Sequence, residues 1–322
     1  MALIDRVFHR LKLRDLRLLE AVIRWKSMAR AAAHLNLTQP AVSKAISELE
    51  YTLGVRLLDR SRQGIEPTAH GLALIRRSTA IFDELRQGVD ELEHLSDPSA
   101  GAIRVAASVP MAAGMLPVII DRLSRRYPRM TIHAREVLVS SLPFQTPPHR
   151  ELRERAVDLV FGPFNRRLMN DDLEVEPLFQ EPLVVAVGKR SPWAKKRRIT
   201  LQDLRDEQWC LPSQDSVAGQ RCIDAFRANG MEVPRRTATT ISVHLQLGLL
   251  ATQRFLTMFP GSLMQFSGDR FDIRKLPISL AVEPLSIGIV RLKGRTMSPA
   301  AQLFVQMARD VSKPLASARL RA

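Results

Sequence analysis

One predicted helix, residues 39–53, carries polar side chains suited to reading DNA bases. Its apolar residues step by four, three and four, which makes one buried stripe of Val42, Ile46, Leu49 and Leu53. The opposite face keeps four polar residues, Gln39, Ser43, Lys44 and Ser47. A glutamine can bond adenine N6 and N7, a lysine can reach guanine or phosphate, and a serine can bond either kind of base edge. These residue types favour recognition of DNA in the major groove, although an ordinary helical hairpin with a solvated face has the same spacing.

Neighbouring segments are predicted to position this face. Leu13 to Trp25 has apolar residues at helical spacing and predicts a first helix. Ser27 is a suitable N-cap for a short alanine-rich second helix, and Thr38 for the third, where Pro40 falls in the first turn. Helix, tight turn and capped helix form a helix-turn-helix. The residues from Leu57 to Ile65 then predict a small hairpin that turns at Gln63-Gly64, which is the wing.

A long helix after Thr68 carries a seam that favours pairing of two chains. Its apolar residues fall at heptad positions, at Ile75, Phe82, Leu85, Val89 and Leu92. Ser96 to Gly101 breaks the helix as a linker. The sequence therefore predicts a winged helix-turn-helix over 1–70, a linker and dimerisation helix over 71–98, and a separate region over 99–322.

The region 99–322 is predicted to be α/β. Strand-like apolar runs alternate with helical ones, as in Ile103 to Ala107 before Met111 to Arg126, and Trp209 to Leu211 before Val217 to Ala228. This alternation predicts mostly parallel sheets covered by helices, and the length leaves room for two of them. Hydrophobic residues at 45% and charged residues at 25% are ordinary for a globular protein.

The net charge of +15 favours an anionic partner such as nucleic acid. Residues 1–77 hold 14 Lys and Arg against 7 Asp and Glu, residues 78–98 hold 1 against 6, and residues 99–322 hold 33 against 20. Most of the positive excess lies outside the predicted DNA-binding end, so charge alone does not locate that site. Lys195-Lys196-Arg197-Arg198 could be a nucleic-acid patch, but a solvated loop after Pro192 is the preferred interpretation.

No catalytic, metal or cofactor pattern stands out in the sequence. The glycine-rich phosphate and dinucleotide loops, the nucleophile elbow and the metalloprotease pattern are absent, and the seven histidines are not grouped with carboxylates at metal-ligand spacing. Cys210 and Cys222 are interpreted as core thiols without an activating cluster of bases. The start of the chain lacks the apolar run of a signal peptide, and no uncharged stretch reaches the ~18 residues of a membrane span. We expect a cytoplasmic protein that is not an enzyme and does not contact a membrane.

The N-terminal residues resemble the signature of LysR-type transcriptional regulators. The match is dense and ordered, at Ser27, Arg30-Ala31-Ala32, Leu35, Thr38-Gln39-Pro40-Ala41-Val42-Ser43-Lys44, Ile46, Leu49-Glu50, Leu53-Gly54-Val55, Leu57-Leu58, Arg60, Thr68 and Gly71. Further on, Asp158 to Gly162, Glu181 to Leu211 and Ser298-Pro299-Ala300-Ala301 also look like that family. Leu11 to Arg17 and Lys26 to Ala32 are most similar to regulators of sugar or aromatic-acid metabolism related to the galactose-binding-protein regulator.

The resemblance implies which residues contact promoter DNA. Gln39, Pro40, Ser43 and Lys44, with Thr38 at the helix start, would face the major groove, and Arg30, Arg60 and Arg62 would contact the backbone. Family members more often have arginine at the position of Lys44 and phenylalanine at that of Leu58. A lysine loses the bidentate geometry of arginine, which changes base preference. The family also implies a homotetramer built from dimers.

The resemblance further implies a C-terminal domain like the periplasmic binding proteins, with a ligand cleft between two lobes. Lobe 1 would span about 102–178 and 281–322, and lobe 2 about 179–280. Ser108 and Val109 end the first strand just before a helix, so the serine and the helix amides could hold a carboxylate or phosphate of an organic or sugar acid. Ser108 could instead only cap that helix. The candidates in lobe 2 are Ser213, Thr240 and Ser242.

Two other classes of protein compete with a ligand-sensing DNA-binding regulator. A cytoplasmic solute-binding protein without regulatory DNA binding would fit the last 220 or so residues. An enzyme is the weaker rival. A DNA mobility shift, ligand binding without DNA binding, and turnover would separate the three.

Overall fold

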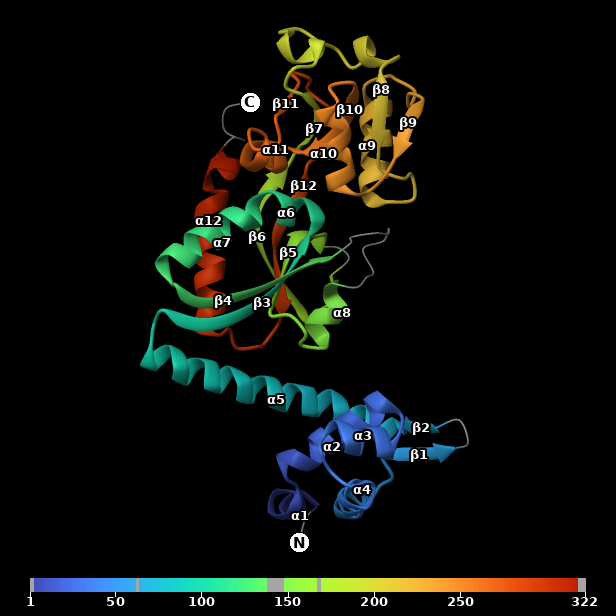
Figure 1. Ribbon diagram of the computed structural model, residues 1–322, viewed down its shortest axis with the longest axis vertical. Coiled ribbons are helices and arrows are strands. Elements are labelled where there is room, and N and C mark those ends of the chain that lie inside the picture. Colours follow the sequence, from blue (N-terminus) through green and yellow to red (C-terminus); the bar gives the residue numbers. More distant parts are fainter. Residues whose placement is uncertain (1–2, 62–63, 138–147, 167–168, 318–322) are drawn as a thin grey trace. The chain divides into compact units, whose positions relative to one another are not determined.

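The computed structural model describes residues 3–61, 64–137, 148–166 and 169–317 (Figure 1). The chain divides into two compact units, Met1–Arg86 and Gln87–Ala322. Their boundary lies inside the long helix α5 (Ala69–Ser96), which therefore contributes residues to both units. No helix in these ranges is long and apolar enough to cross a membrane.

The N-terminal unit is a helical cluster with a two-stranded hairpin. Its elements are α1 (Leu3–Arg10), α2 (Leu13–Trp25), α3 (Met28–His34), α4 (Gln39–Leu53), β1 (Leu58–Ser61), β2 (Gly64–Pro67) and the first part of α5. Ser27 Oγ accepts a hydrogen bond from the Arg30 amide, and Thr38 Oγ1 accepts one from the Ala41 amide, both at 3.4 Å. The two predicted N-caps are therefore confirmed. The hairpin is confirmed too, with Leu58 opposite Pro67 and Ser61 opposite Gly64.

The apolar faces of α2, α3 and α4 form the core of this unit. Fully buried side chains from all three helices meet there, at Leu19, Val22, Ala31, Val42 and Ile46. Gly54 ends α4 in the left-handed conformation at φ 73°. The short helix α1, which lies against α4, was not predicted.

The predicted heptad seam on α5 divides into two sets of residues. Ile75 packs against the core of the N-terminal unit, and the guanidinium of Arg17 lies 5.8 Å from the centre of the half-buried Phe82 ring. In contrast, Leu85, Val89 and Leu92 leave 53%, 50% and 66% of their surface exposed. Only this second set presents an open apolar face in the single chain, while Ile75 is partly covered by the core of its own unit, and the seam between chains stays a prediction. The heptad pattern alone does not show whether an apolar side chain is covered by its own chain or by a second chain.

The C-terminal unit is built on two five-stranded sheets, one in each lobe. The first has the order β4-β3-β5-β12-β6 and the second β11-β7-β10-β8-β9. The strands are β3 (Ala100–Ser108), β4 (Arg129–Val137), β5 (Leu159–Pro163), β6 (Leu173–Glu181), β7 (Leu183–Gly188), β8 (Gln208–Leu211), β9 (Arg236–Thr239), β10 (Phe255–Pro260), β11 (Ile273–Lys275) and β12 (Leu285–Leu292).

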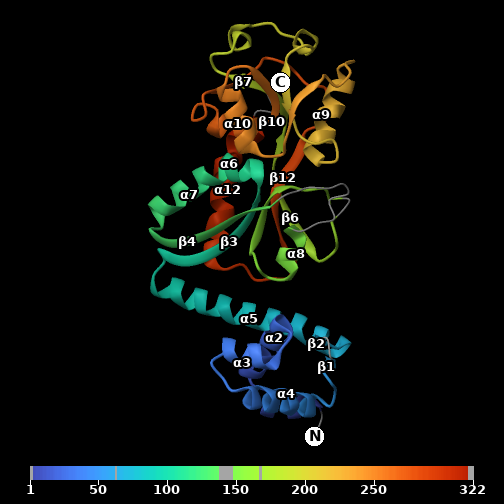
Figure 2. The ribbon, with the colours of Figure 1, turned by 45° about the vertical axis from the view of Figure 1, so that its right-hand side comes forward.

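Both sheets are mixed, which corrects the expectation of mostly parallel sheets. In the first sheet β3 runs parallel to β4 and β5, but β12 runs antiparallel to β5 and β6. In the second sheet β8 is parallel to β9 and β10, but β7 is antiparallel to β10 and β11. The chain passes from the first sheet to the second along β6 and β7 and returns along β12 (Figure 2). These strands therefore run against those of the βαβ units.

Helices cover both faces of each sheet. They are α6 (Val109–Ala113), α7 (Met115–Arg126), α8 (Pro148–Arg153), α9 (Val217–Ala228), α10 (Val243–Ala251), α11 (Gly261–Ser267) and α12 (Pro299–Ser317), with short 3₁₀ turns η2 (Pro192–Lys195) and η3 (Gln202–Leu204). In Figure 1, α7 and α12 lie on one side of the first sheet and α8 on the other. The helix predicted over Met111 to Arg126 is interrupted at Gly114, where an added Cβ would lie 3.3 Å from Leu263 Cα of α11.

The buried carboxylate of Asp158 links three segments of the first lobe. Asp158 Oδ1 accepts hydrogen bonds from Arg104 Nη2 at 2.8 Å and Arg295 Nη2 at 2.6 Å, and Oδ2 accepts one from the Arg104 amide at 2.8 Å. Burial pushes the pKa of Asp158 upward, but the hydrogen bonds from Arg104 and the charges of both arginines outweigh it, so this pKa lies below its ordinary value. The ionised form is therefore the native one.

Candidate functional site

The N-terminal part of α4 presents an exposed polar face. Gln39, Pro40 and Lys44 are exposed and Ser43 is half-buried, while the apolar stripe of the same helix faces the core. Lys44 Nζ lies 3.9 Å from Glu48 Oε1, and both side chains are more than two-thirds exposed. Such a surface pair contributes little, about 0.3–0.5 kcal/mol, so Lys44 can exchange this partner for a phosphate or a base. The face has the shape and residue types of a recognition helix.

Residues around α4 fix its position and extend the basic surface. Glu50 Oε1 accepts hydrogen bonds from the amides of Leu57 at 2.7 Å and Leu58 at 3.2 Å, which holds the start of the hairpin against the helix. Arg30 on α3 and Arg60 on β1 are both exposed. Arg62, the other predicted backbone contact, lies outside the described residues.

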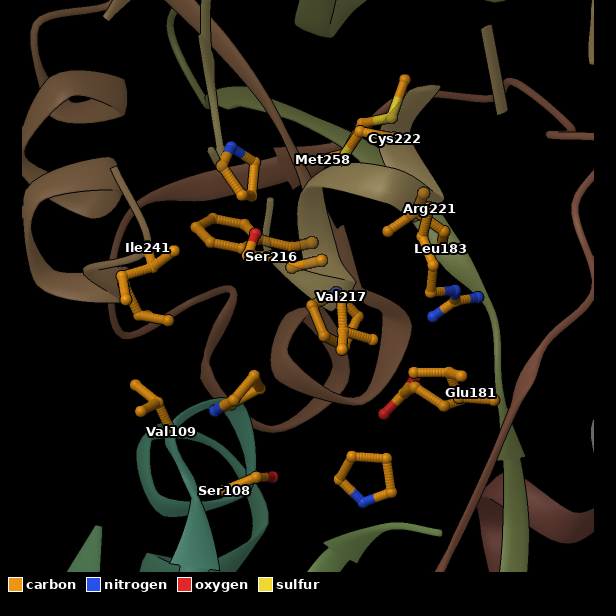
Figure 3. Close-up of a pocket in the computed structure, with 18 of the residues that line it drawn as sticks. Ser108, Val109, Glu181, Leu183, Ser216, Val217, Arg221, Cys222, Ile241 and Met258 are labelled. Carbon is orange, nitrogen blue, oxygen red and sulfur yellow. The ribbon is translucent and has the colours of Figure 1, made fainter. Parts of the chain in front are cut away.

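A pocket of about 350 Å³ lies between the two lobes of the C-terminal unit (Figure 3). It is formed by the β3–α6 junction and by β6, β7, α9, α10, β10 and β12. Its volume falls in the range of ~300–1,000 Å³ that is usual for small-molecule sites. Most of its lining residues are apolar, among them Val109, Leu183, Val217, Ile241 and Met258.

Ser108 lines this pocket and is only 4% exposed. Its side chain makes no capping hydrogen bond to α6 and has no hydrogen-bond partner within the described residues. The alternative that Ser108 only caps the helix is therefore not what the geometry shows. Because α6 has just five residues, its dipole gives an anion little help, and the hydroxyl is the more useful group.

The other predicted effector residues are placed differently. Val109 and Ser213 line the pocket, and Ser213 Oγ bonds Asp215 Oδ1 at 3.1 Å. Thr240 and Ser242 are not among the lining residues, and only Ile241 between them reaches the pocket. Thr240 Oγ1 accepts a hydrogen bond from the Ser242 amide, and Ser242 Oγ caps α10. Their hydroxyl groups are used for local structure.

Three charged residues that line the pocket were missed by the sequence reasoning: the exposed Asp215 and the buried Glu181 and Arg221. Glu181, at the end of β6, is 1% exposed and accepts hydrogen bonds from the Ser262 amide at 2.9 Å and from Ser262 Oγ. Burial raises the pKa of Glu181, although these hydrogen bonds and the charge of Arg221 oppose the shift. Glu181 therefore holds a proton more readily than an exposed glutamate does.

Arg221 of α9 is 9% exposed, and its Nη2 donates to the Glu283 carbonyl oxygen at 2.9 Å. Burial lowers its pKa. In Figure 3 its guanidinium extends to the same side of the pocket as the Glu181 carboxyl group. One signal could have revealed this residue: at helical spacing it shares a face with the apolar Val217 and Ala225, where a charge is unusual.

Both cysteines belong to the C-terminal unit. Cys210 on β8 is fully buried, and burial raises the pKa of its thiol to about 11, so the unreactive thiol form persists at neutral pH. Cys222 lines the pocket wall and is 2% exposed. The described residues contain no group of three or more His, Cys, Asp or Glu side chains that could hold a metal ion.

Comparison with known families covers both units. Residues 13–72 match the family described as bacterial regulatory helix-turn-helix protein, lysR family, and residues 96–313 match the LysR substrate binding domain. The chain belongs to the LysR family of transcriptional regulators. The resemblance drawn from the sequence is thus confirmed, as is the architecture of a helix-turn-helix unit followed by an α/β substrate-binding domain.

Relatives and solved structures agree with this assignment. The chain is similar to the HTH-type transcriptional regulator GbpR of Azospirillum brasilense, with 29% identity over 94% of this chain and 87% of GbpR. It is also similar to the regulator TdcA of Escherichia coli K12, with 28% identity over 94% of this chain and 93% of TdcA. Full-length CbnR in complex with its target DNA has the same fold, with a TM-score of 0.61 and 23% identity over 94% of this chain and 100% of CbnR. This LysR-family chain is a DNA-binding transcriptional regulator.

Proposed function

We propose that this LysR-family regulator binds promoter DNA through α4 and the wing, and that a small anionic effector in the pocket between the lobes changes that binding. The observation that carries the proposal is the presence, in one chain, of an exposed recognition face on α4 and a pocket with a buried arginine in the C-terminal unit. We expect this to take place in the cytoplasm and without enzymatic turnover.

We assign base reading to Gln39, Ser43 and Lys44, and backbone contacts to Arg30, Arg60 and Arg62. Thr38 and Pro40 set the start of α4, through the cap and the proline in its first turn. Gln39→Ala should reduce discrimination between operator and random DNA, because an adenine contact is lost. Arg60→Ala should weaken both complexes equally and reduce the salt dependence by about one phosphate contact. Binding titrations at several salt concentrations measure both effects, and equal losses for Gln39→Ala on the two DNAs would contradict its role.

We place the contact between chains on the open apolar face of α5. Leu85, Val89 and Leu92 are half exposed or more and share heptad-related positions, which favours helix pairing. A dimer of dimers with DNA half-sites one helical turn apart would follow. Analytical ultracentrifugation of the full chain tests this assembly.

The effector must bind the two DNA-binding arrangements of the protein with different affinity, because otherwise it could not shift their populations. Support for an anionic effector comes from Arg221 and from Ser108, which lines the pocket and whose hydroxyl makes no hydrogen bond within the described residues. A ligand at ~100 times its dissociation constant should stabilise the protein by about 2.7 kcal/mol, which a thermal-shift screen of metabolites detects.

Ser108→Ala provides the matched functional test. It should raise the effector concentration needed for a transcriptional response and leave operator affinity without effector unchanged. An unaltered response would remove Ser108 from the site. Ligand binding that never changes DNA binding would instead favour a solute-binding role for the C-terminal unit.

A further inference from the structure

The pocket wall is mostly apolar and has only a few side chains that could bond the hydroxyl groups of a ligand. Seventeen of its 24 lining residues are apolar. Of the polar ones, Ser216 Oγ bonds the Ser213 carbonyl oxygen at 2.7 Å and accepts the Gly219 amide, and Gln246 Nε2 bonds Thr257 at 3.2 Å. A buried hydroxyl group without a partner costs about 1–3 kcal/mol. A sugar acid with several hydroxyl groups would meet this cost repeatedly.

Arg221 has hydrogen-bonding capacity directed at the pocket. A guanidinium carries five N–H donors, and within the described residues Arg221 makes one hydrogen bond, to the Glu283 carbonyl oxygen. It is more than nine-tenths buried, so the remaining donors have little access to bulk water. A ligand carboxylate can take two of them in the bidentate geometry that arginine favours.

Glu181 does not occupy those donors. The two charges interact electrostatically but form no ion pair, and the Glu181 carboxyl group is bonded instead to the start of α11. Together with Asp215, however, it places two acidic side chains at the pocket against one arginine. A second negative charge on the ligand would lie near the Asp215 carboxylate and would find no second cation among the described lining residues.

We infer that the pocket takes a monocarboxylic acid with an apolar aliphatic or aromatic body, whose carboxylate binds the Arg221 guanidinium. This inference rests on the proposed role of the pocket as the effector site. It narrows the ligand to a singly charged acid and excludes sugar acids, dicarboxylates and neutral analogues.

A matched set of ligands tests each part of this assignment on the full-length protein. The probes are hydrocinnamate and isocaproate as apolar monocarboxylates, hydrocinnamamide as the neutral match, glutarate as the dicarboxylate and gluconate as the sugar acid. At least one apolar monocarboxylate should raise the melting temperature and bind in calorimetry, and the other three probes should not. Equal or tighter binding by the amide, glutarate or gluconate, or binding by none of the probes, would overturn the assignment.

Variants on one helix test the anchor itself. Arg221→Gln should weaken binding of the apolar monocarboxylate by about 10- to 100-fold, the usual value of hydrogen bonds to a charged group. Arg221→Lys should keep part of the affinity for the monocarboxylate. As the control, Arg227→Gln removes an exposed arginine from the same helix α9 and should change this affinity less than about twofold. Unchanged far-UV circular dichroism and operator binding show that Arg221→Gln still folds. Normal affinity in that variant would refute the role of Arg221.

The outcomes also separate the ligand class from the regulatory role. If a sugar acid or dicarboxylate binds and still changes operator binding, the regulatory role of the pocket is kept and the proposed class of ligand is wrong. If hydrocinnamate or isocaproate binds through Arg221 but leaves operator binding unchanged, the class stands and the regulatory role of the pocket is wrong.

Discussion

Replacing Asp158 by asparagine should strongly destabilise the C-terminal unit. The Asp158 side chain is 8% exposed and the Arg295 side chain beside it is 5% exposed, so Asp158→Asn removes a negative charge that a buried arginine contacts at 2.6 Å. Breaking a buried pair in this way costs about 3–5 kcal/mol. In a unit of this size, each kcal/mol of lost stability lowers the melting temperature by about 2–4 °C, so the melting temperature should fall by roughly 6–20 °C.

The same substitution at an exposed pair provides the control. Asp121 lies 3.0 Å from Arg125 Nε on α7, but the two side chains are 58% and 78% exposed, so Asp121→Asn should cost less than about 1 kcal/mol. Scanning calorimetry of the full chain compares the two variants. If both shift the transition equally, the buried network around Asp158 is not a major source of stability.

The pH dependence of this effect has a definite sign. The pKa of folded Asp158 is lowered, so its contribution to stability is complete above the ordinary aspartate value and is lost as the pH falls through the folded pKa. The difference between the wild-type chain and Asp158→Asn should therefore be full at neutral pH and should shrink in acid below about pH 3.9. A difference that is constant with pH would contradict this account.

Further substitutions test three other parts of the structure. Gly71→Ala should destabilise the N-terminal unit, because a Cβ there would lie 2.1 Å from a backbone carbonyl oxygen. At Gly88, on the same helix, a Cβ would meet nothing within 4 Å, so Gly88→Ala should stabilise the chain by about 1 kcal/mol. Thermal melts measure both effects. Leu85→Glu with Leu92→Glu should yield smaller species in sedimentation velocity, and an unchanged assembly would reject the apolar face of α5. Glu181→Gln should stabilise the C-terminal unit at neutral pH. Because the pKa of Glu181 is raised, the stability of the wild-type chain falls as the pH rises from 4.5 through the folded pKa. This dependence of stability on pH should disappear in the variant. Identical slopes in calorimetry would contradict that.

The N-terminal unit could be predicted from sequence because its signals are local. Ser27 and Thr38 are caps whose partners lie three residues away, and Gly54 is read from its position after the last apolar residue. The predicted start and end of α2 agree with the structure. The early helix α1 escaped notice because eight residues give too short a pattern to separate from a disordered start.

In the C-terminal unit strands such as β3 and β8 could be predicted from their apolar runs, but β6, β9, β11 and β12 could not. Burial along β6 does not alternate regularly, and β12 has a continuous buried centre with half-buried ends. Neither strand is followed by the helix of a βαβ unit, so the alternation used for the other strands gave no signal. Both belong to the antiparallel half of their sheet, which explains why mostly parallel sheets were predicted.

The pocket charges depend on contacts that no local pattern encodes. Glu181 and Arg221 are 40 positions apart, on β6 of the first sheet and on α9, and both line the pocket because β6 ends where the chain crosses to the second sheet. Reasoning from polarity selected Thr240 and Ser242 instead, but short hydroxyl side chains near a helix start are often used as caps, as they are here.

The same two residues connect the pocket to both segments that join the lobes. Glu181 ends β6 on the outgoing segment, and Arg221 holds the Glu283 carbonyl oxygen on the segment that returns to β12. A carboxylate bound to Arg221 therefore acts on a group that already contacts the returning segment. An effector changes a conformational equilibrium only through contacts that differ between the states. We expect such contacts where the chain crosses between lobes, because a change in the angle between two packed sheets is absorbed by the segments that join them.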